Sequence, residues 1–126
     1  MDERWDPHEE RDGPLLIRAE AAPGGGHVLA LSGELDLKNA ETLAVEIAKS
    51  GVADGDSLTI DLGGLEFIDS TGIALLVSVF RRFNAAGGQL RLVPSRSESV
   101  RRVMELTGLD RTLPFDDRKE SHDPIA

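Results

Sequence analysis

The sequence predicts a mixed α/β domain in which crossover helices cover a sheet that contains both antiparallel and parallel strands. Two apolar runs, at 15–19 and 27–32, flank a Pro-Gly-Gly-Gly segment, which indicates a β-hairpin because glycine supplies the positive φ of tight turns. From residue 58 onward, strand-like and helix-like apolar spacings alternate. Such strand–helix–strand repeats require right-handed crossovers and parallel pairing. The expected order is therefore β-β-α-β-α-β-α.

The first helix is expected to begin at Asp36, because aspartate is a favoured N-cap, and to end at Gly51, because glycine is typical of helix C-termini. The apolar residues between these two positions recur at i, i+3, i+4, i+7 and i+8, which places them on a single stripe. The stripe consists of Ala40, Leu43, Ala44, Ile47 and Ala48.

The third strand is expected to end near Leu62, and a short loop should lead from there to a second helix over 71–86. At about 100° per residue, one broad apolar face of this helix forms the core side, with Val79 on its edge. That core face consists of Ile73, Leu76, Val77, Phe80 and Phe83. A glycine pair at 87–88 closes the helix, and a fourth strand over 90–93 follows and stops at Pro94.

The third helix has two candidate N-caps. Ser95 with Glu98 fits a capping box, and Ser97 competes with it. Its inner stripe is expected to hold Val100, Val103, Met104 and Thr107. Gly108 followed by Leu109 resembles a Schellman ending. Leu113 and Phe115 are expected either to add a short last strand or to pack against the domain.

The formal net charge of −9 is concentrated at the two ends of the 126-residue chain. Residues 1–12 hold six acids and two bases, and residues 116–126 hold four acids and two bases, so only −3 remains for 13–115. We therefore expect a disordered acidic extension at 1–13, one folded domain at 14–115 and a flexible tail at 116–126. This balance disfavours nucleic acid and acidic membrane surfaces as partners, because both attract clustered Lys and Arg.

The absence of cysteine excludes a disulfide scaffold and thiol catalysis, and it fits a reducing cytosol. No run reaches the ~18 apolar residues of a membrane span, and the polar N-terminus differs from a signal peptide. We therefore expect a cytoplasmic protein.

The most informative segment is the junction at 58–72, where a strand and a loop deliver Asp69, Ser70 and Thr71 to the first turn of an apolar helix. The first N–H groups of a helix lack partners, and the helix dipole leaves a partial positive charge there. A phosphate on Ser70 can therefore be accommodated without melting the helix. The alternative is that Asp69 and Ser70 only cap the helix, the commonest role of these residue types at such positions.

Leu75 points away from the core stripe and lies one turn after Ser70. One interpretation is that it packs under a neighbouring loop, since single exposed leucines are common. The other is that Ala74, Leu75 and Ser78 form a small docking patch beside the hydroxyl groups.

Four stretches together resemble the STAS domain, specifically the stand-alone anti-sigma factor antagonists of bacteria. They are Leu-Ala-Leu-Ser-Gly-Glu-Leu-Asp at 29–36, Ile-Asp-Leu at 60–62, Phe-Ile-Asp-Ser-Thr-Gly at 67–72 and Leu-Thr-Gly-Leu-Asp at 106–110. The resemblance covers about residues 14–115, and the stretches follow the order of the family.

The resemblance implies a partner switch. The unmodified antagonist would bind an anti-sigma factor that is also a serine kinase, and a sigma factor would be released. The kinase would phosphorylate the serine after the motif aspartate, here Ser70, and a serine phosphatase would reverse the modification. Asp36 matches a family position near that serine and at the partner surface. The residues expected to bind the partner are Asp36, Asp69, Thr71, Gly72, Ala74, Leu75 and Ser78. We expect a monomer or weak dimer.

The runner-up hypothesis is a STAS scaffold that is never phosphorylated, such as a stress-complex or transporter-associated subunit. It would bind a protein partner constitutively through the same surface.

An enzyme is disfavoured. Asp-Ser-Thr-Gly at 69–72 has one residue more than the Asp-Thr/Ser-Gly of aspartic proteases, and no second such motif completes a carboxylate pair. The chain lacks the Gly-x-Ser-x-Gly turn of serine hydrolases and a phosphate-binding loop of the Walker type. His8, His27 and His122 are unpersuasive as bases or metal ligands. We expect no cofactor, no metal site and no catalytic residue.

Overall fold

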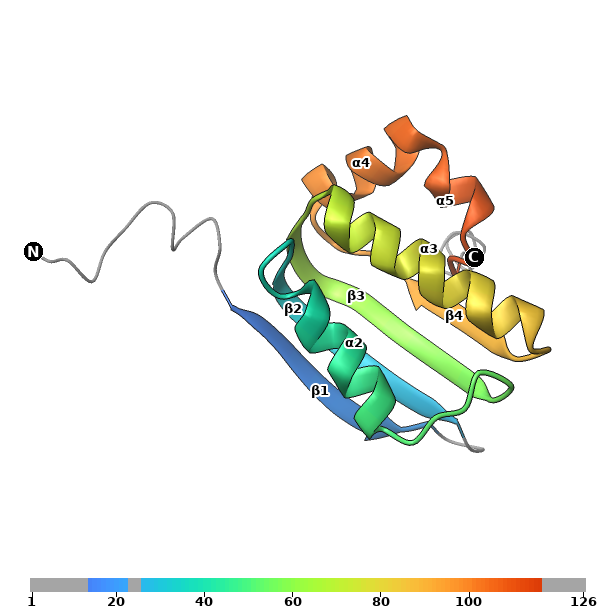
Figure 1. The fold of residues 1–126 in the computed structure, drawn as a ribbon. Helices are drawn as coiled ribbons and strands as arrows, with labels where there is room; N and C mark the ends of the chain where they lie inside the picture. The colour runs from blue at the N-terminus through green and yellow to red at the C-terminus, as the bar shows by residue number, and fades with distance from the viewer. Residues whose placement is uncertain (1–13, 23–25, 117–126) are drawn as a thin grey trace, which may run out of the picture.

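A four-stranded mixed sheet forms the centre of the computed structural model, which describes residues 14–22 and 26–116 (Figure 1). Its order is β1-β2-β3-β4, with β1 at Leu15–Ala21, β2 at His27–Leu35, β3 at Ser57–Ile68 and β4 at Gln89–Val93. β1 pairs with β2 antiparallel, whereas β2, β3 and β4 pair in parallel. The predicted mixed α/β fold and the hairpin are thus confirmed.

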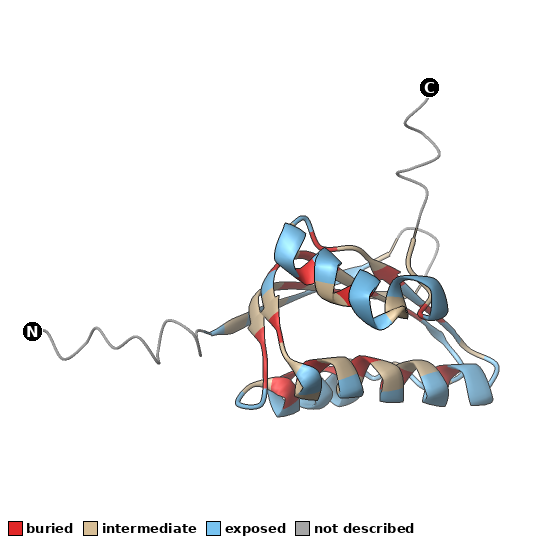
Figure 2. Cartoon of the chain, turned by 90° about the horizontal axis from the view of Figure 1, so that it is seen from above, coloured by how far each residue is buried: buried red, intermediate tan, exposed pale blue. Residues whose placement is uncertain are grey.

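Two layers of helices enclose the sheet (Figures 1 and 2). The helices are α2 at Ala40–Lys49, α3 at Ser70–Ala85, α4 at Glu98–Thr107 and the single turn α5 at Leu109–Thr112. The two crossovers β2-α2-β3 and β3-α3-β4 advance in the same direction along the sheet, so a common handedness places α2 and α3 on one face. α4 and α5 lie on the other face, where α4 contacts β3.

Core residues lie on both faces of the sheet: those of α2 and α3 pack on one face, and Val100 and Met104 of α4 pack on the other. Figure 2 shows buried residues on the sides of the elements that face one another. Successive residues of a strand point to opposite faces, and paired residues of neighbouring strands share a face. Leu29 and Ile60 are paired and buried, whereas the adjacent pair of Ala30 and Asp61 is only half-buried. The face toward α4 is therefore the more polar one.

The third strand is longer than predicted: β3 continues to Ile68, where a loop was expected after Leu62. Gly63 and Gly64 follow Leu62 directly, and neither has a positive φ, so neither requires a turn there. A bulge shifts the register between β2 and β3, and beyond it the pairing resumes at Ser32 and Gly64. Gly64 permits the close approach of the two strands, since a Cβ on Gly64 would lie 2.8 Å from that of Ser32.

The buried stripes of the helices are narrower than predicted or are rotated. In α2, Ala44 and Ala48 are exposed, and the buried residues are Ala40, Leu43 and Ile47. In α3, Val79 is central rather than peripheral, and the buried residues are Gly72, Leu76, Val79 and Phe83. The predicted core residues Ile73, Val77 and Phe80 are half-buried against that cluster. In α4, Val100 and Met104 are buried and Val103 is half-buried, while Thr107 is exposed.

One predicted cap is wrong, because the N-cap of α2 is Asn39 rather than Asp36. Of the two candidates for the N-cap of α4, the structure has Ser97 and not Ser95. Ser95 is buried, where its hydroxyl donates to Leu65 O at 2.7 Å and accepts from Ser97 N at 2.8 Å. A tertiary contact to β3 thus replaces the predicted local capping box.

The predicted glycine ends are confirmed, because Gly51 and Gly108 both have positive φ angles just after a helix. α5 follows Gly108 directly, and the segment after it makes one parallel bridge between Leu92 and Phe115.

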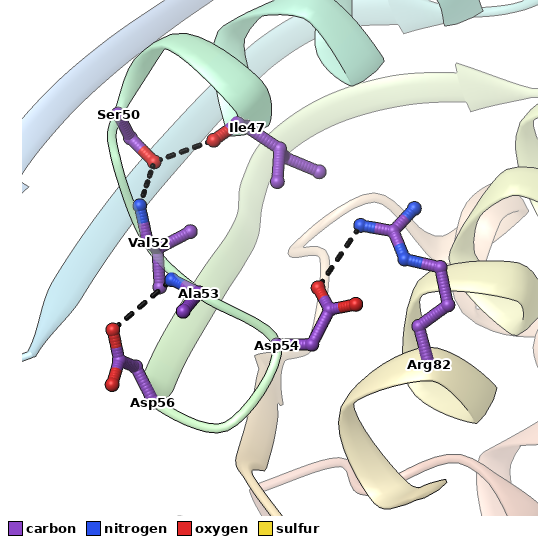
Figure 3. A network of polar contacts seen from close by, with 7 residues as sticks. All are labelled: Ile47, Ser50, Val52, Ala53, Asp54, Asp56 and Arg82. Carbon is purple, nitrogen blue, oxygen red and sulfur yellow. Dashed lines mark hydrogen bonds and ion pairs between the residues drawn. The ribbon is translucent and has the colours of Figure 1, made fainter. Parts of the chain in front are cut away.

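α3 is held at both ends. At its C-terminal end, Arg82 Nη2 lies 3.3 Å from Asp54 Oδ1 in the loop between α2 and β3 (Figure 3). That loop is ordered by Ser50, whose hydroxyl donates to Ile47 O at 2.6 Å and accepts from Val52 N at 3.2 Å. The ion pair is largely exposed and therefore contributes at most about 1 kcal/mol. The other end of α3 is fixed by the contacts of Asp69, described below.

The predictions for residues 1–13, for 117–126 and for most of the turn at 23–26 lie outside the described residues. None of the helices in the described part of the chain has the length and apolar character that a membrane span requires.

Candidate functional site around Ser70

Asp69 is the N-cap of α3, as predicted. Its backbone is extended, with φ −114° and ψ −173°, as expected of a residue that precedes a helix. Its Oδ1 atom accepts from Thr71 N at 2.9 Å and from Gly72 N at 3.1 Å. Two of the first N–H groups of the helix are therefore already paired, and they are not free to hold a phosphate as the sequence suggested.

The second carboxylate oxygen of Asp69 ties the start of α3 to the loop that follows β2. Asp69 Oδ2 accepts from Leu37 N at 3.1 Å, and Asp69 N donates to Leu35 O at 3.2 Å. These contacts join positions about 32 residues apart in the chain. One aspartate thus positions both its own helix and the neighbouring loop.

The loop itself is shaped by Asp36 and Asn39. Asp36 Oδ1 accepts from Lys38 N at 3.0 Å and from Asn39 N at 3.3 Å, while Asn39 Oδ1 accepts from Asp36 N at 3.0 Å. The Asp36 side chain is buried, and its Oδ2 atom has no hydrogen-bond partner among the described residues. Asp36 was expected at the partner surface, but its side chain lies beneath that surface and organises the loop.

Leu37 is the exposed apolar residue of this loop, with 73% of its area exposed. Sequence reasoning missed it. The available signal was a single apolar residue between Asp36 and Lys38 in a polar loop. With Asp36 as the helix cap, Leu37 would lie in the first turn of the helix, so it was not considered as a surface residue.

Ser70 is the first residue of α3 and is exposed, whereas Thr71 is half-buried. A group added to the Ser70 hydroxyl therefore enters solvent rather than the core. It also lies within the first turn, where the helix dipole favours negative charge.

The other predicted patch residues divide into two groups. Ala74 and Ser78 are exposed on α3. Leu75 is half-buried and packs against the core, in agreement with the interpretation that it is covered by its own domain. We use the term "Ser70 surface" for the exposed residues Leu37, Ser70, Ala74 and Ser78.

Gly72 is buried and does not belong to the Ser70 surface. A Cβ at this position would lie 2.7 Å from Leu35 O and 2.9 Å from Ile68 Cγ1. The close approach that this glycine permits is therefore to the end of β2.

Replacing Gly72 with alanine is expected to lower the free energy of unfolding by about 1–3 kcal/mol, the usual cost of overpacking. The loss should occur even though alanine is intrinsically favoured in helices by ~1 kcal/mol. Urea denaturation followed by circular dichroism measures it. Ser78→Ala, on the exposed side of the same helix, is the control and should change stability by less than about 0.5 kcal/mol. A Gly72→Ala protein as stable as this control would contradict the predicted clash.

The chain is similar to known proteins in sequence. The family model described as "STAS domain" matches residues 17–122. An anti-sigma-F factor antagonist of Mycobacterium tuberculosis is 33% identical over 90 residues, which cover 71% of this chain and 71% of that protein. The anti-sigma-B factor antagonist of Bacillus subtilis is 29% identical over 90 residues, which cover 71% of this chain and 81% of that protein.

The fold is similar to that of a solved structure as well. The crystal structure of an anti-sigma factor antagonist from Mycobacterium paratuberculosis superimposes with a TM-score of 0.66 at 30% sequence identity. The match covers 81% of this chain and 85% of that chain.

Proposed function

The chain belongs to the STAS domain family, and from this premise we propose that it is an anti-sigma factor antagonist whose binding is switched by phosphorylation of Ser70. Family membership makes it a regulatory protein and not an enzyme. In its unmodified form it binds an anti-sigma factor with serine kinase activity and thereby releases a sigma factor. Phosphorylated Ser70 ends that binding, and a serine phosphatase restores it.

The observation that carries the proposal is the position of Ser70: it is exposed, first in its helix and next in sequence to Asp69, whose carboxylate accepts from the backbone N–H of the exposed Leu37. A phosphate adds about −1.5 to −2 charge. At a helix start this charge gains roughly 0.3–1 kcal/mol from the dipole, so the fold survives. A partner packed over the uncharged hydroxyl would have to bury that charge, which costs several kcal/mol.

The contacts of Asp69 give a second reason why a phosphate on Ser70 would disrupt partner binding more than folding. Its carboxylate already occupies the N–H groups of Thr71 and Gly72. A phosphate on Ser70 therefore has little reason to fold back onto the helix start, where it would meet a second negative group. It projects outward, into the space that a bound partner would occupy.

The proposed partners, location and oligomeric state follow from the same switch. The partners are the kinase-type anti-sigma factor and the phosphatase, the location is the cytoplasm, and the protein acts as a monomer or weak dimer. Neither nucleic acid nor a membrane is a proposed partner.

Phosphorylation in vitro tests the proposal. The chain is incubated with Mg-ATP and each purified kinase-type anti-sigma factor of the source genome, the modified residue is located by mass spectrometry, and affinity is measured by calorimetry before and after modification. We expect one cognate factor to modify Ser70 and then to lose its affinity for the product.

Ser70→Ala should bind the cognate factor within a few-fold of the unmodified protein and should resist modification, because the side chain is small and exposed. Ser99→Ala, on α4, is the control and should still be phosphorylated at Ser70. A Ser70 that no factor modifies, together with tight binding that Ser70→Asp leaves unchanged, would instead support the constitutive scaffold.

A further inference from the structure

A polar hollow of about 200 Å³ lies on the sheet face toward α4, away from the α2–α3 layer. Its lining includes Arg18 from β1, Ser32 from β2, Asp61, Gly63 and Gly64 from β3, and Arg96 from the segment before α4. Arg18, Ala30 and Asp61 occupy one cross-strand row, so their side chains share this face. The site is separate from the Ser70 surface and does not depend on the proposed switch.

The β-bulge forms the floor of the hollow. Ala30 pairs with Asp61 and Ser32 pairs with Gly64, so Leu31 alone opposes two residues of β3. The bulge is stabilised by Asp61 Oδ1, which accepts from Gly63 N at 2.8 Å, and by Gly63 O, which accepts from Arg96 N at 3.2 Å. The floor is therefore fixed by its own hydrogen bonds before any ligand is present.

Gly63 provides space for the charged groups above this floor. Its φ is not positive, so its backbone does not demand glycine. A Cβ there would lie 2.9 Å from Arg96 Nη1 and 2.9 Å from Asp61 Oδ1. The missing side chain thus lets a guanidinium and a carboxylate extend over the bare backbone.

The arginines retain unused donors. Within the described residues the Arg96 guanidinium has no hydrogen bond or ion pair. Arg18 donates through Nε to Glu20 Oε2 at 2.7 Å, and its terminal nitrogens form no further hydrogen bond within the described part of the chain. The guanidinium group matches phosphate oxygens in geometry and charge.

We propose that this hollow binds a phosphate group, either free phosphate or the phosphate of a small metabolite. Arg18 and Arg96 contact the phosphate oxygens. Asp61 and Ser32 accept hydrogen bonds from hydroxyl groups of the ligand when it carries them. A volume near 200 Å³ is smaller than the roughly 300–1,000 Å³ of drug-sized sites, which restricts the ligand to a small molecule.

An NMR titration of the ¹⁵N-labelled full chain tests the proposal at constant ionic strength. The probes are inorganic phosphate, glucose 6-phosphate and glucose. We expect saturable shifts of the Gly63 and Gly64 amides and of the Arg96 Nε–H signal with one or both phosphates, and none with glucose. Saturation by inorganic phosphate at equal affinity identifies free phosphate as the ligand, whereas tighter binding of glucose 6-phosphate identifies a phosphorylated metabolite.

Matched variants assign the binding to the hollow. Arg96→Gln should weaken binding at least tenfold, while Arg102→Gln, which removes the same charge from the exposed surface of α4, should leave it unchanged. Gly63→Ala should also weaken binding and still fold, since the atoms that its Cβ meets belong to movable side chains. Shifts that stay linear with concentration, or equal affinity in Arg96→Gln and Arg102→Gln, would overturn the proposal.

Discussion

Replacing Phe83 with alanine is expected to lower the free energy of unfolding by about 3–5 kcal/mol. Phe83 is completely buried in the last turn of α3 and is the largest fully buried side chain in the described chain. The sequence holds four phenylalanines, one tryptophan and no tyrosine, so few other bulky side chains can fill the cavity. Domains of this size have only about 5–15 kcal/mol of stability in total.

Urea denaturation followed by far-UV circular dichroism measures the loss. Phe80→Ala is the matched control, because Phe80 lies on the same helix and is only half-buried, and its effect should be clearly smaller. If Phe83→Ala does not fold, Phe83→Leu provides a milder probe of the same position. Equal losses for the alanine variants at 80 and 83 would mean that the core is not centred where the structure places it.

Ser70→Asp is expected to weaken binding of the cognate anti-sigma factor by at least about a hundredfold, at ~1.4 kcal/mol per factor of ten. The change places a permanent negative charge in the middle of the Ser70 surface, where an interface would have to desolvate it. The melting temperature should stay within a few degrees, since the residue is exposed and a negative charge suits a helix start by roughly 0.3–1 kcal/mol.

Ser99→Asp is the matched control for this experiment. Ser99 is also exposed and also lies in the first turn of a helix, but that helix, α4, covers the opposite face of the sheet. The affinity of the Ser99→Asp protein for the cognate anti-sigma factor should equal that of the unsubstituted protein. A large drop in the melting temperature of Ser70→Asp alone would show that Ser70 is a structural residue, and equal loss of binding by both variants would point to a general effect of charge.

The parts of the site that were predictable from sequence are those made by local contacts. Asp69 caps α3 through bonds to residues two and three positions ahead, so capping rules were sufficient to find it. Asp36 makes the same local contacts, accepting from the N–H groups two and three positions ahead, but they shape a turn that precedes α2, and the distant Asp69 binds the loop as well. Leu37 was missed for that reason: its exposure depends on where the loop is held.

The limits of the fold prediction have a similar origin. The strand pattern and chain order predicted the mixed sheet, but the length of β3 depended on pairing with β2 through a bulge, which no local pattern encodes. The buried stripe of α3 centres on Val79 because both the sheet and α2 contact the helix. Periodicity identified an amphipathic helix correctly, whereas its orientation was decided by neighbours far away in the chain.

The shared anchor at Asp69 has a kinetic consequence. One carboxylate binds both the loop bearing Leu37 and the helix bearing Ser70, so the two segments are tied to each other. Phosphorylation of the Ser70 hydroxyl would then release a bound partner without a slow rearrangement of the domain. Under the proposed switch, the rate of partner exchange would be governed by the turnover of the kinase and phosphatase and by spontaneous dissociation of the complex.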